Sequence, residues 1–166
     1  MYQKILLTLD GSPLARAAIG HAKTLAEGTD CAVTVLQVVE SLDMTRLAMI
    51  PEAYESGRSL EEVAKGVHFA RKSAAEGEVQ RAAEILRNAG VEQVQPIVRE
   101  GLPANVILDT ATSEDANAIV MATRGHSGLG REVTGSVAEF VLRHAGPLAV
   151  VLVGPRTADP ATGQWT

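Results

Sequence analysis

The chain begins with Ile5-Leu6-Leu7-Thr8-Leu9-Asp10-Gly11-Ser12-Pro13, a stretch that contains three successive structural signals. Its first five residues are almost entirely apolar, which is typical of a strand covered on both faces of a sheet. Ser12 can cap a helix, and Pro13 suits the first helical position because the amide hydrogen it lacks is not needed there. We therefore expect a strand, a tight loop and a helix in succession.

The same alternation of strand and helix continues along the chain. Small and apolar residues recur at helical spacing after Pro13, ahead of a terminator at Gly28: Leu14, Ala17, Ala18, His21, Ala22 and Leu25. Further strands are predicted at 31–39, 94–98, 118–122 and 148–153. Helical stripes lie between them: Val79, Ala82, Ala83, Ile85 and Leu86, then Val106, Ile107, Thr110 and Ala111 after Pro103. Strands that alternate with helices predict an α/β fold, a single doubly wound five-stranded parallel sheet with helices on both faces.

Composition restricts the class of protein. The 166 residues suffice for one core, and the formal net charge of −5 without a basic patch argues against nucleic acid as the main partner. Cys31 is the only cysteine, so the chain has no internal disulfide and no cysteine cluster for a metal. The first apolar run is too short for a signal peptide or a membrane span, and we expect a cytoplasmic protein without membrane contact.

Two segments depart from the regular pattern. Residues 40–68 have weak periodicity, and we expect a partly helical flap or a loop there. Residues 155–166 are poor in apolar side chains, which predicts a disordered tail after a domain that spans 1–154. Trp165 in this tail has no evident role.

A glycine-rich segment connects the strand at 118–122 to the last helix. Its glycines permit close approach of backbone amides to an anion: Gly125, Gly128, Gly130 and Gly135. The helix beginning near Ser136 adds free N–H donors, and positive charge comes from Arg124, His126 and Arg131. Ligands of open α/β sheets bind beyond the carboxyl ends of the strands, so this segment predicts a phosphate site.

A structural interpretation of the same residues is also open. Ser136 and Glu139 have the spacing of a capping box, which would explain both as a helix start. The segment is not a Walker loop, and the first loop, at 10–12, lacks the dinucleotide fingerprint. Asp10 likewise has two interpretations, as a ligand-binding carboxylate or as a turn residue that accepts a bond from Gly11 or Ser12.

The spacing of these glycines resembles the signature of the universal stress protein family. Nine residues separate Gly125 from Gly135-Ser136, as in that signature, and the last helix and strand (GSVAEFVLRHAGPLAVVLV) are similar to the family's. KILLTLDGS at the N-terminus and REGLPANVIL resemble its first strand and its Gly-x-Pro segment. The resemblance extends over nearly the whole chain up to residue 154.

This resemblance implies an adenine nucleotide alpha-hydrolase-like sheet in the order 3-2-1-4-5, a homodimer and, in one branch of the family, ATP binding. Asp10 would lie beside the ribose or the nucleotide-bound Mg, and the Val38 backbone would meet the adenine edge. The nucleotide-binding set implied by position is Leu9, Asp10, Val38, Met121, Ala122, Arg124, Gly125, Gly135, Ser136 and Val137. Ala122 replaces the first signature glycine, and its methyl would crowd the ligand if that backbone needs positive φ.

Three functions are compatible with these features. The first is a regulatory stress-response protein that binds ATP (or AMP, ADP or cyclic AMP) and changes its contacts with an unidentified protein partner. The second is a dimeric interaction module without nucleotide, and the third a nucleotidyl-transfer enzyme. No nucleophile and base are recognisable as a pair, so we expect no catalytic residue and at most slow hydrolysis. Leu148–Val153, if it lies at the sheet edge, is the expected dimer strand.

Overall fold

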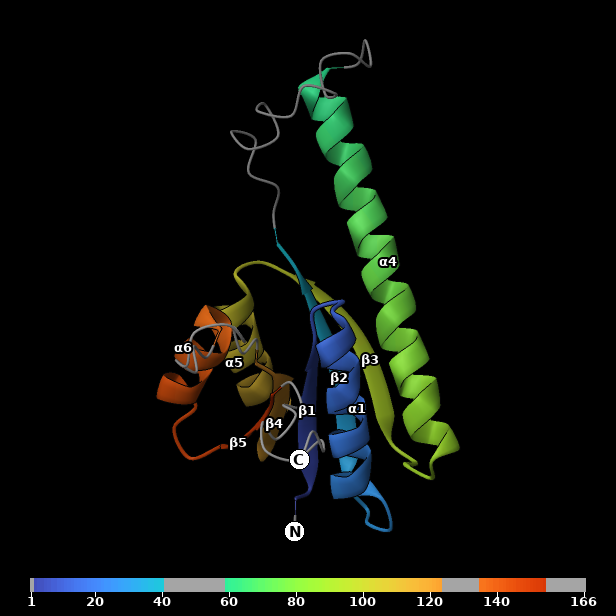
Figure 1. Cartoon of the computed structure of the whole chain (residues 1–166), viewed down its shortest axis with the longest axis vertical. Helices are drawn as coiled ribbons and strands as arrows, with labels where there is room; N and C mark the ends of the chain where they lie inside the picture. The colour runs from blue at the N-terminus through green and yellow to red at the C-terminus, as the bar shows by residue number, and fades with distance from the viewer. Residues whose placement is uncertain (1, 41–58, 124–134, 155–166) are drawn as a thin grey trace, which may run out of the picture.

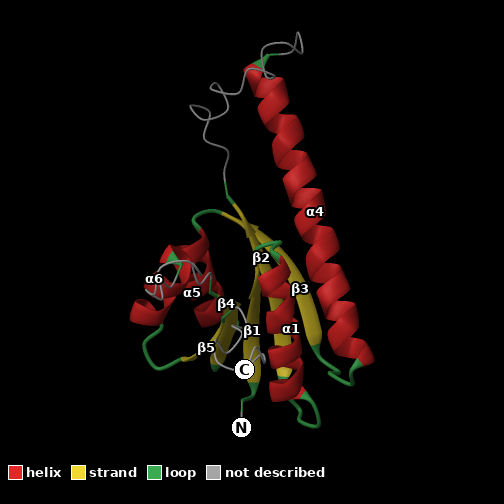
Figure 2. Ribbon diagram, viewed as in Figure 1, coloured by secondary structure: helices red, strands yellow, loops and turns green. Residues whose placement is uncertain are grey.

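The structure is a computed structural model that describes residues 2–40, 59–123 and 135–154. Its five strands form one parallel sheet in the order β3-β2-β1-β4-β5 (Figures 1 and 2). They are β1 (Lys4–Leu9), β2 (Ala32–Val39), β3 (Val94–Glu100), β4 (Ala118–Ala122) and β5 (Ala149–Val153). The predicted architecture and strand order are therefore confirmed, and β5 lies at an edge of the sheet.

Helices cover both faces of the sheet. One face carries α1 (Pro13–Ala26) and α4 (Leu60–Asn88), and the other carries α5 (Pro103–Ser113) and α6 (Ser136–His144) (Figure 1). Alternate residues of β1 point to opposite faces, so Ile5 and Leu7 enter the α1/α4 core whereas Leu6 enters the α5/α6 core. This double burial explains why β1 is an uninterrupted apolar run.

The loop between β1 and α1 has the geometry that its sequence predicts. Ser12 Oγ accepts a hydrogen bond from the Ala15 amide at 3.1 Å, and Pro13 is the first helical residue. Asp10 Oδ1 accepts from the Ser12 amide at 2.9 Å, which confirms its role as a turn residue. The buried face of α1 is rotated from the expected stripe, because His21 and Ala17 are exposed. The residues that pack on the sheet are Ala15, Ala18, Ile19, Ala22 and Ala26.

Helix α4 is longer than the sequence pattern predicts. It begins at Leu60, where Ser59 and Glu62 form a capping box, so residues 60–68 of the expected flap are the first turns of a 29-residue helix. The weak periodicity there has a simple reason, since this end of α4 extends past the sheet and has no long face to bury (Figure 1). Ile85, expected on the buried stripe, is 51% exposed. The rest of the flap, 41–58, and the tail, 155–166, lie outside the described residues.

Across the three described ranges, no helix combines the length and the apolar character required to cross a membrane.

Candidate functional site

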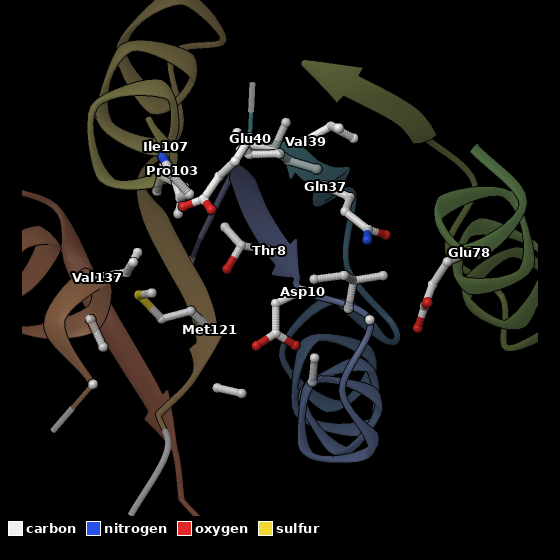
Figure 3. A pocket seen from close by; sticks show the side chains of 18 of the residues that line it. Thr8, Asp10, Gln37, Val39, Glu40, Glu78, Pro103, Ile107, Met121 and Val137 are labelled. Atoms are coloured by element: carbon white, nitrogen blue, oxygen red, sulfur yellow. The ribbon is translucent and has the colours of Figure 1, made fainter. Parts of the chain in front are cut away.

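A pocket of about 690 Å³ lies where β1, β2 and β4 end. Its walls come from the β1–α1 loop, the last residues of β2, the start of α6, the start of α5 and one side of α4 (Figure 3). Because all five strands are parallel, their carboxyl ends meet at one edge of the sheet, which is where a crevice opens in folds of this kind. The fold thus places the pocket beside the β1–α1 loop, the end of β4 and the start of α6.

Asp10 borders this pocket directly after β1. Its carboxylate points into the pocket in Figure 3, while Oδ1 accepts from the Ser12 amide. Both interpretations offered by the sequence are therefore compatible, because a carboxylate has several lone-pair sites. Leu9, just before it, is buried and also lines the pocket.

The backbone of Val38 lies where β1 leaves the sheet. Successive residues of β2 direct their backbone groups alternately to the two neighbouring strands: the Ala32 amide donates to Gln3 at the start of β1, whereas the Val39 carbonyl accepts from Gly101 beyond β3. Val38 therefore faces β1, and it is one residue beyond the last paired position, where Leu9 is opposite Gln37. Its main chain therefore lies past the last β1–β2 pair, at the edge of the pocket that Val38 lines.

The backbone at Ala122 does not adopt the positive φ at which an alanine methyl group would crowd a ligand. It is the last residue of β4, paired with Val153, and its φ is not positive. The methyl group is half-buried and lines the pocket next to the buried Met121. A glycine is therefore not required at this position for conformational reasons.

Helix α6 begins at the pocket wall without a side-chain cap. Its N-cap residue is Gly135, with φ −57° and ψ 146°, so neither positive φ nor a capping box occurs here. The predicted capping box is wrong because the helix begins at Ser136 itself, one residue earlier than a Ser136 cap requires, and Glu139 instead pairs with Arg143 at 2.8 Å. The first amides of a helix have no partner within the helix, and those of Ser136, Val137 and Ala138 are at the pocket wall.

The α1/α4 side contributes a polar wall that the sequence patterns did not predict. Gln37 on β2 and Arg71 and Glu78 on α4 line the pocket. Glu78 is bonded to Arg16 of α1, with Nε to Oε1 at 3.4 Å. The sequence did contain one signal, because Gln37 interrupts the apolar run of β2, but nothing in it placed α4 opposite that strand.

The described lining carries more negative than positive charge. Asp10, Glu40 and Glu78 contribute carboxylates, and Arg71 is the cation among the described lining residues. That part of the lining contains no histidine or cysteine, and no group of three metal-ligating side chains occurs in the described ranges. The predicted positive charges, Arg124, His126 and Arg131, lie outside the described residues, as do Gly125, Gly128 and Gly130.

The sequence matches the model of the Universal stress protein family over residues 1–153. The chain belongs to the universal stress protein family. A universal stress protein from Methanocaldococcus jannaschii is 32% identical over 170 residues, which cover 94% of this chain and 85% of the relative.

Solved structures share the fold of this universal stress protein. The structure of hypothetical protein MJ0577 superposes with a TM-score of 0.74 at 24% identity and covers 95% of this chain and 99% of its own. A universal stress protein solved in complex with cAMP has a TM-score of 0.63 at 18% identity, with 92% and 97% covered. At these identities the likeness establishes the fold.

The structure brings together most of the site residues that the sequence of this universal stress protein predicts. Eight of the ten line the single pocket described above: Leu9, Asp10, Val38, Met121, Ala122, Gly135, Ser136 and Val137. Arg124 and Gly125 lie outside the described residues. Contact of any of these residues with a ligand stays a prediction.

Proposed function

We propose that this universal stress protein binds an adenine nucleotide, ATP foremost, in the pocket at the strand ends and thereby regulates its contacts with another protein. The observation that carries the proposal is the start of α6, which reaches the pocket wall with no side-chain cap. The first amides of a helix, which lack partners within the helix, and the positive end of the helix dipole favour a phosphate group at this place.

The remaining walls suggest how the nucleotide lies. Its phosphates would meet the amides of Ser136 and Val137, and its base would lie against the backbone of Val38. Asp10, between them, would accept from a ribose hydroxyl or contact a Mg²⁺ ion carried by the phosphates, since Mg²⁺ prefers oxygen ligands. Arg124 and Gly125 are proposed to complete the phosphate site.

A binding role with at most slow hydrolysis agrees best with the described lining. The described lining offers carboxylates but neither histidine nor cysteine, and we propose that it binds the nucleotide and hydrolyses it slowly at most. The relative solved with cAMP supports adenine nucleotides as the ligand class and makes cyclic AMP the main alternative to ATP. We propose that ligand occupancy changes the surface offered to a protein partner in the cytoplasm.

We also propose a homodimer formed through β5. This strand is at the sheet edge, so one row of its backbone groups faces away from β4. All of its residues are apolar, and no charged side chain of β5 opposes pairing with a second copy.

Isothermal titration of nucleotide-free protein with ATP and Mg²⁺ tests the proposed function. We expect saturable binding that weakens about tenfold or more in Gly135→Val, because a branched side chain at the N-cap blocks the approach of phosphate to the amides. Gly154→Val is the matched control, since Gly154 has open space around it and does not line the pocket.

Mass spectrometry of ligand released from freshly purified, denatured protein identifies the nucleotide. An absence of heat with ATP, AMP, ADP and cyclic AMP, together with no released ligand, contradicts the proposal and favours an interaction module without nucleotide.

A further inference from the structure

Two polar side chains converge on the α1/α4 side of the pocket. A Cβ placed on Gly11 would be 3.7 Å from Gln37 Nε2 and 3.7 Å from Glu78 Oε2. The amide of Gln37 and the carboxylate of Glu78 therefore both lie close to the Gly11 backbone. Figure 3 shows both side chains on the same side of the pocket, Gln37 from β2 and Glu78 from α4. Residues 41 positions apart in the chain thus form one polar wall.

The acceptor of this amide has no partner. Gln37 Oε1 is buried and forms no hydrogen bond in the described structure. The neighbouring residues on the same face of β2, Val33 and Val35, are apolar and fully packed in the core. A buried acceptor without a donor destabilises a fold relative to an apolar side chain of the same shape. The presence of glutamine at this position therefore needs an explanation outside the folding of the chain.

The carboxylate next to it also retains acceptor capacity. The Glu78 side chain is 14% exposed, and its ion pair with Arg16 is a contact of 3.4 Å to a side chain that is 62% exposed. This contact engages Oε1, whereas Oε2 is the oxygen near Gly11. The ion pair holds the carboxylate in position and leaves the second oxygen toward the pocket.

The chemistry of this wall selects the part of a ligand that binds there. Near Gly11 the Glu78 carboxylate disfavours phosphate, and both Glu78 Oε2 and Gln37 Oε1 can accept from O–H or N–H groups, while the Gln37 amide nitrogen can donate in return. Arg71, seven residues earlier on α4, lines the outer part of the same wall. The opposite wall, at the start of α6, has the reverse preference. The pocket therefore has a donor-binding end and an anion-binding end.

We infer that Gln37 and Glu78 form a specificity site that accepts hydrogen bonds from the hydroxyl or amino donors of the nucleoside and orients the phosphates toward α6. This inference rests on the proposed nucleotide function and deepens it. Ribose hydroxyls and the amino group of the base are both hydrogen-bond donors, and the titrations below distinguish between them.

Titrations of two variants and two controls test the inference. Gln37→Leu removes the amide at nearly constant size, and Glu78→Gln removes only the charge. The controls are Gln95→Leu on the exposed side of β3 and Glu84→Gln on the exposed side of α4. The probes are ATP, 2′-deoxyATP, 3′-deoxyATP, inosine triphosphate and inorganic triphosphate, each with Mg²⁺.

We expect ATP affinity to fall about threefold to tenfold in Gln37→Leu and about tenfold or more in Glu78→Gln, in line with neutral and charged hydrogen bonds. Binding of inorganic triphosphate should change less than about twofold, because it lacks the nucleoside. Thermal unfolding of Gln37→Leu without ligand should show no loss of stability, a result that a purely structural glutamine does not give.

The ligand series identifies the donor. If wild type and variants bind a deoxy nucleotide with equal affinity, the hydroxyl missing from that nucleotide is the group that Gln37 and Glu78 bind. If wild type and variants bind inosine triphosphate with equal affinity, the group bound is the amino group of the base. Wild-type ATP affinity in both variants overturns the inference and leaves the proposed function intact. Absence of ATP binding by the wild-type protein overturns both.

Discussion

Gly101 is a residue whose backbone leaves little freedom for substitution. It connects β3 to α5 with φ +140°, and its amide donates to the Val39 carbonyl at 3.2 Å. A Cβ at this position would be 2.9 Å from Val106 Cγ2, closer than side chains tolerate. The positive φ and the contact both exclude larger residues, which explains the glycine of the Gly-Leu-Pro sequence before α5.

We predict that Gly101→Ala lowers the free energy of unfolding by about 1–3 kcal/mol, because alanine strains the backbone and collides with Val106. Chemical denaturation monitored by circular dichroism measures the change. Gly20→Ala is the control, since Gly20 lies within α1 with open space around it, and it should raise stability by about 0.5–1 kcal/mol. Equal stability of wild type and Gly101→Ala contradicts the prediction.

Cys31 has a structural rather than a chemical role. It precedes β2 and is 3% exposed, within the α1/α4 core. Burial raises the pKa of its thiol, so the neutral form persists at physiological pH and the sulfur packs as a small apolar group.

Among the elements, α4 depends on β3 for support at its outer half. Glu100, the last residue of β3, accepts from Lys72 Nζ at 3.1 Å and lies 3.3 Å from His68 Nε2. His68 and Lys72 lie on either side of Arg71 in the sequence, and Arg71 lines the pocket. The contacts with Glu100 therefore fix the part of α4 that forms the outer wall of the pocket. The hydrogen bond from Lys72, followed by its charge and that of His68, lowers the pKa of Glu100.

The lowered pKa predicts an acid dependence of stability. A carboxylate with a depressed folded pKa stabilises the fold above its unfolded pKa, here about 4.5, and this contribution disappears as pH falls through the folded value. The melting temperature of wild type should therefore be slightly higher than that of Glu100→Gln near neutral pH. This difference in melting temperature should vanish at acid pH, below the folded pKa of Glu100. The effect is small because Glu100 and Lys72 are 43% and 45% exposed.

Thermal melts across this pH range measure the difference. Glu92→Gln, at an exposed position in the loop between α4 and β3, is the matched control and should follow wild type throughout. A difference between Glu100→Gln and wild type that persists unchanged at acid pH would contradict the assignment.

At the level of the whole molecule, β5 is the edge strand through which we propose that two copies pair. Backbone groups of Ala149 and Val153 are directed to β4, because the Ala149 amide donates to Asn117 and the Val153 carbonyl accepts from Thr123. By alternation, the amides of Val150 and Leu152 point away from the sheet. Those amides are the donors available to a second copy.

We predict that Val150→Pro converts the proposed dimer to monomer, since proline removes an outward donor without breaking a bond to β4. Sedimentation velocity measures the association state. Val150→Ala loses much of the same side chain and keeps the amide, so it should remain dimeric. A monomeric wild-type protein, or dimers in both variants, contradicts pairing through β5.

Much of this architecture follows from local sequence alone. The apolar run of β1, the cap at Ser12 and the proline after it specify a strand, a turn and a helix, because each depends on neighbouring residues only. Alternation of such units leads to a parallel sheet, and a parallel sheet puts its pocket at the strand ends. Asp10 and the start of α6 could be placed at the site on these grounds.

Long-range packing settled what local sequence could not. The start of α4, its approach to Gln37 and the proximity of Glu78 to Gly11 depend on contacts between residues far apart in the chain. The same holds for the rotated face of α1 and for the strand geometry of Ala122, whose pairing with Val153 fixes its φ. Local patterns encode which elements form; the distances that give a pocket its chemistry arise only when those elements are packed together.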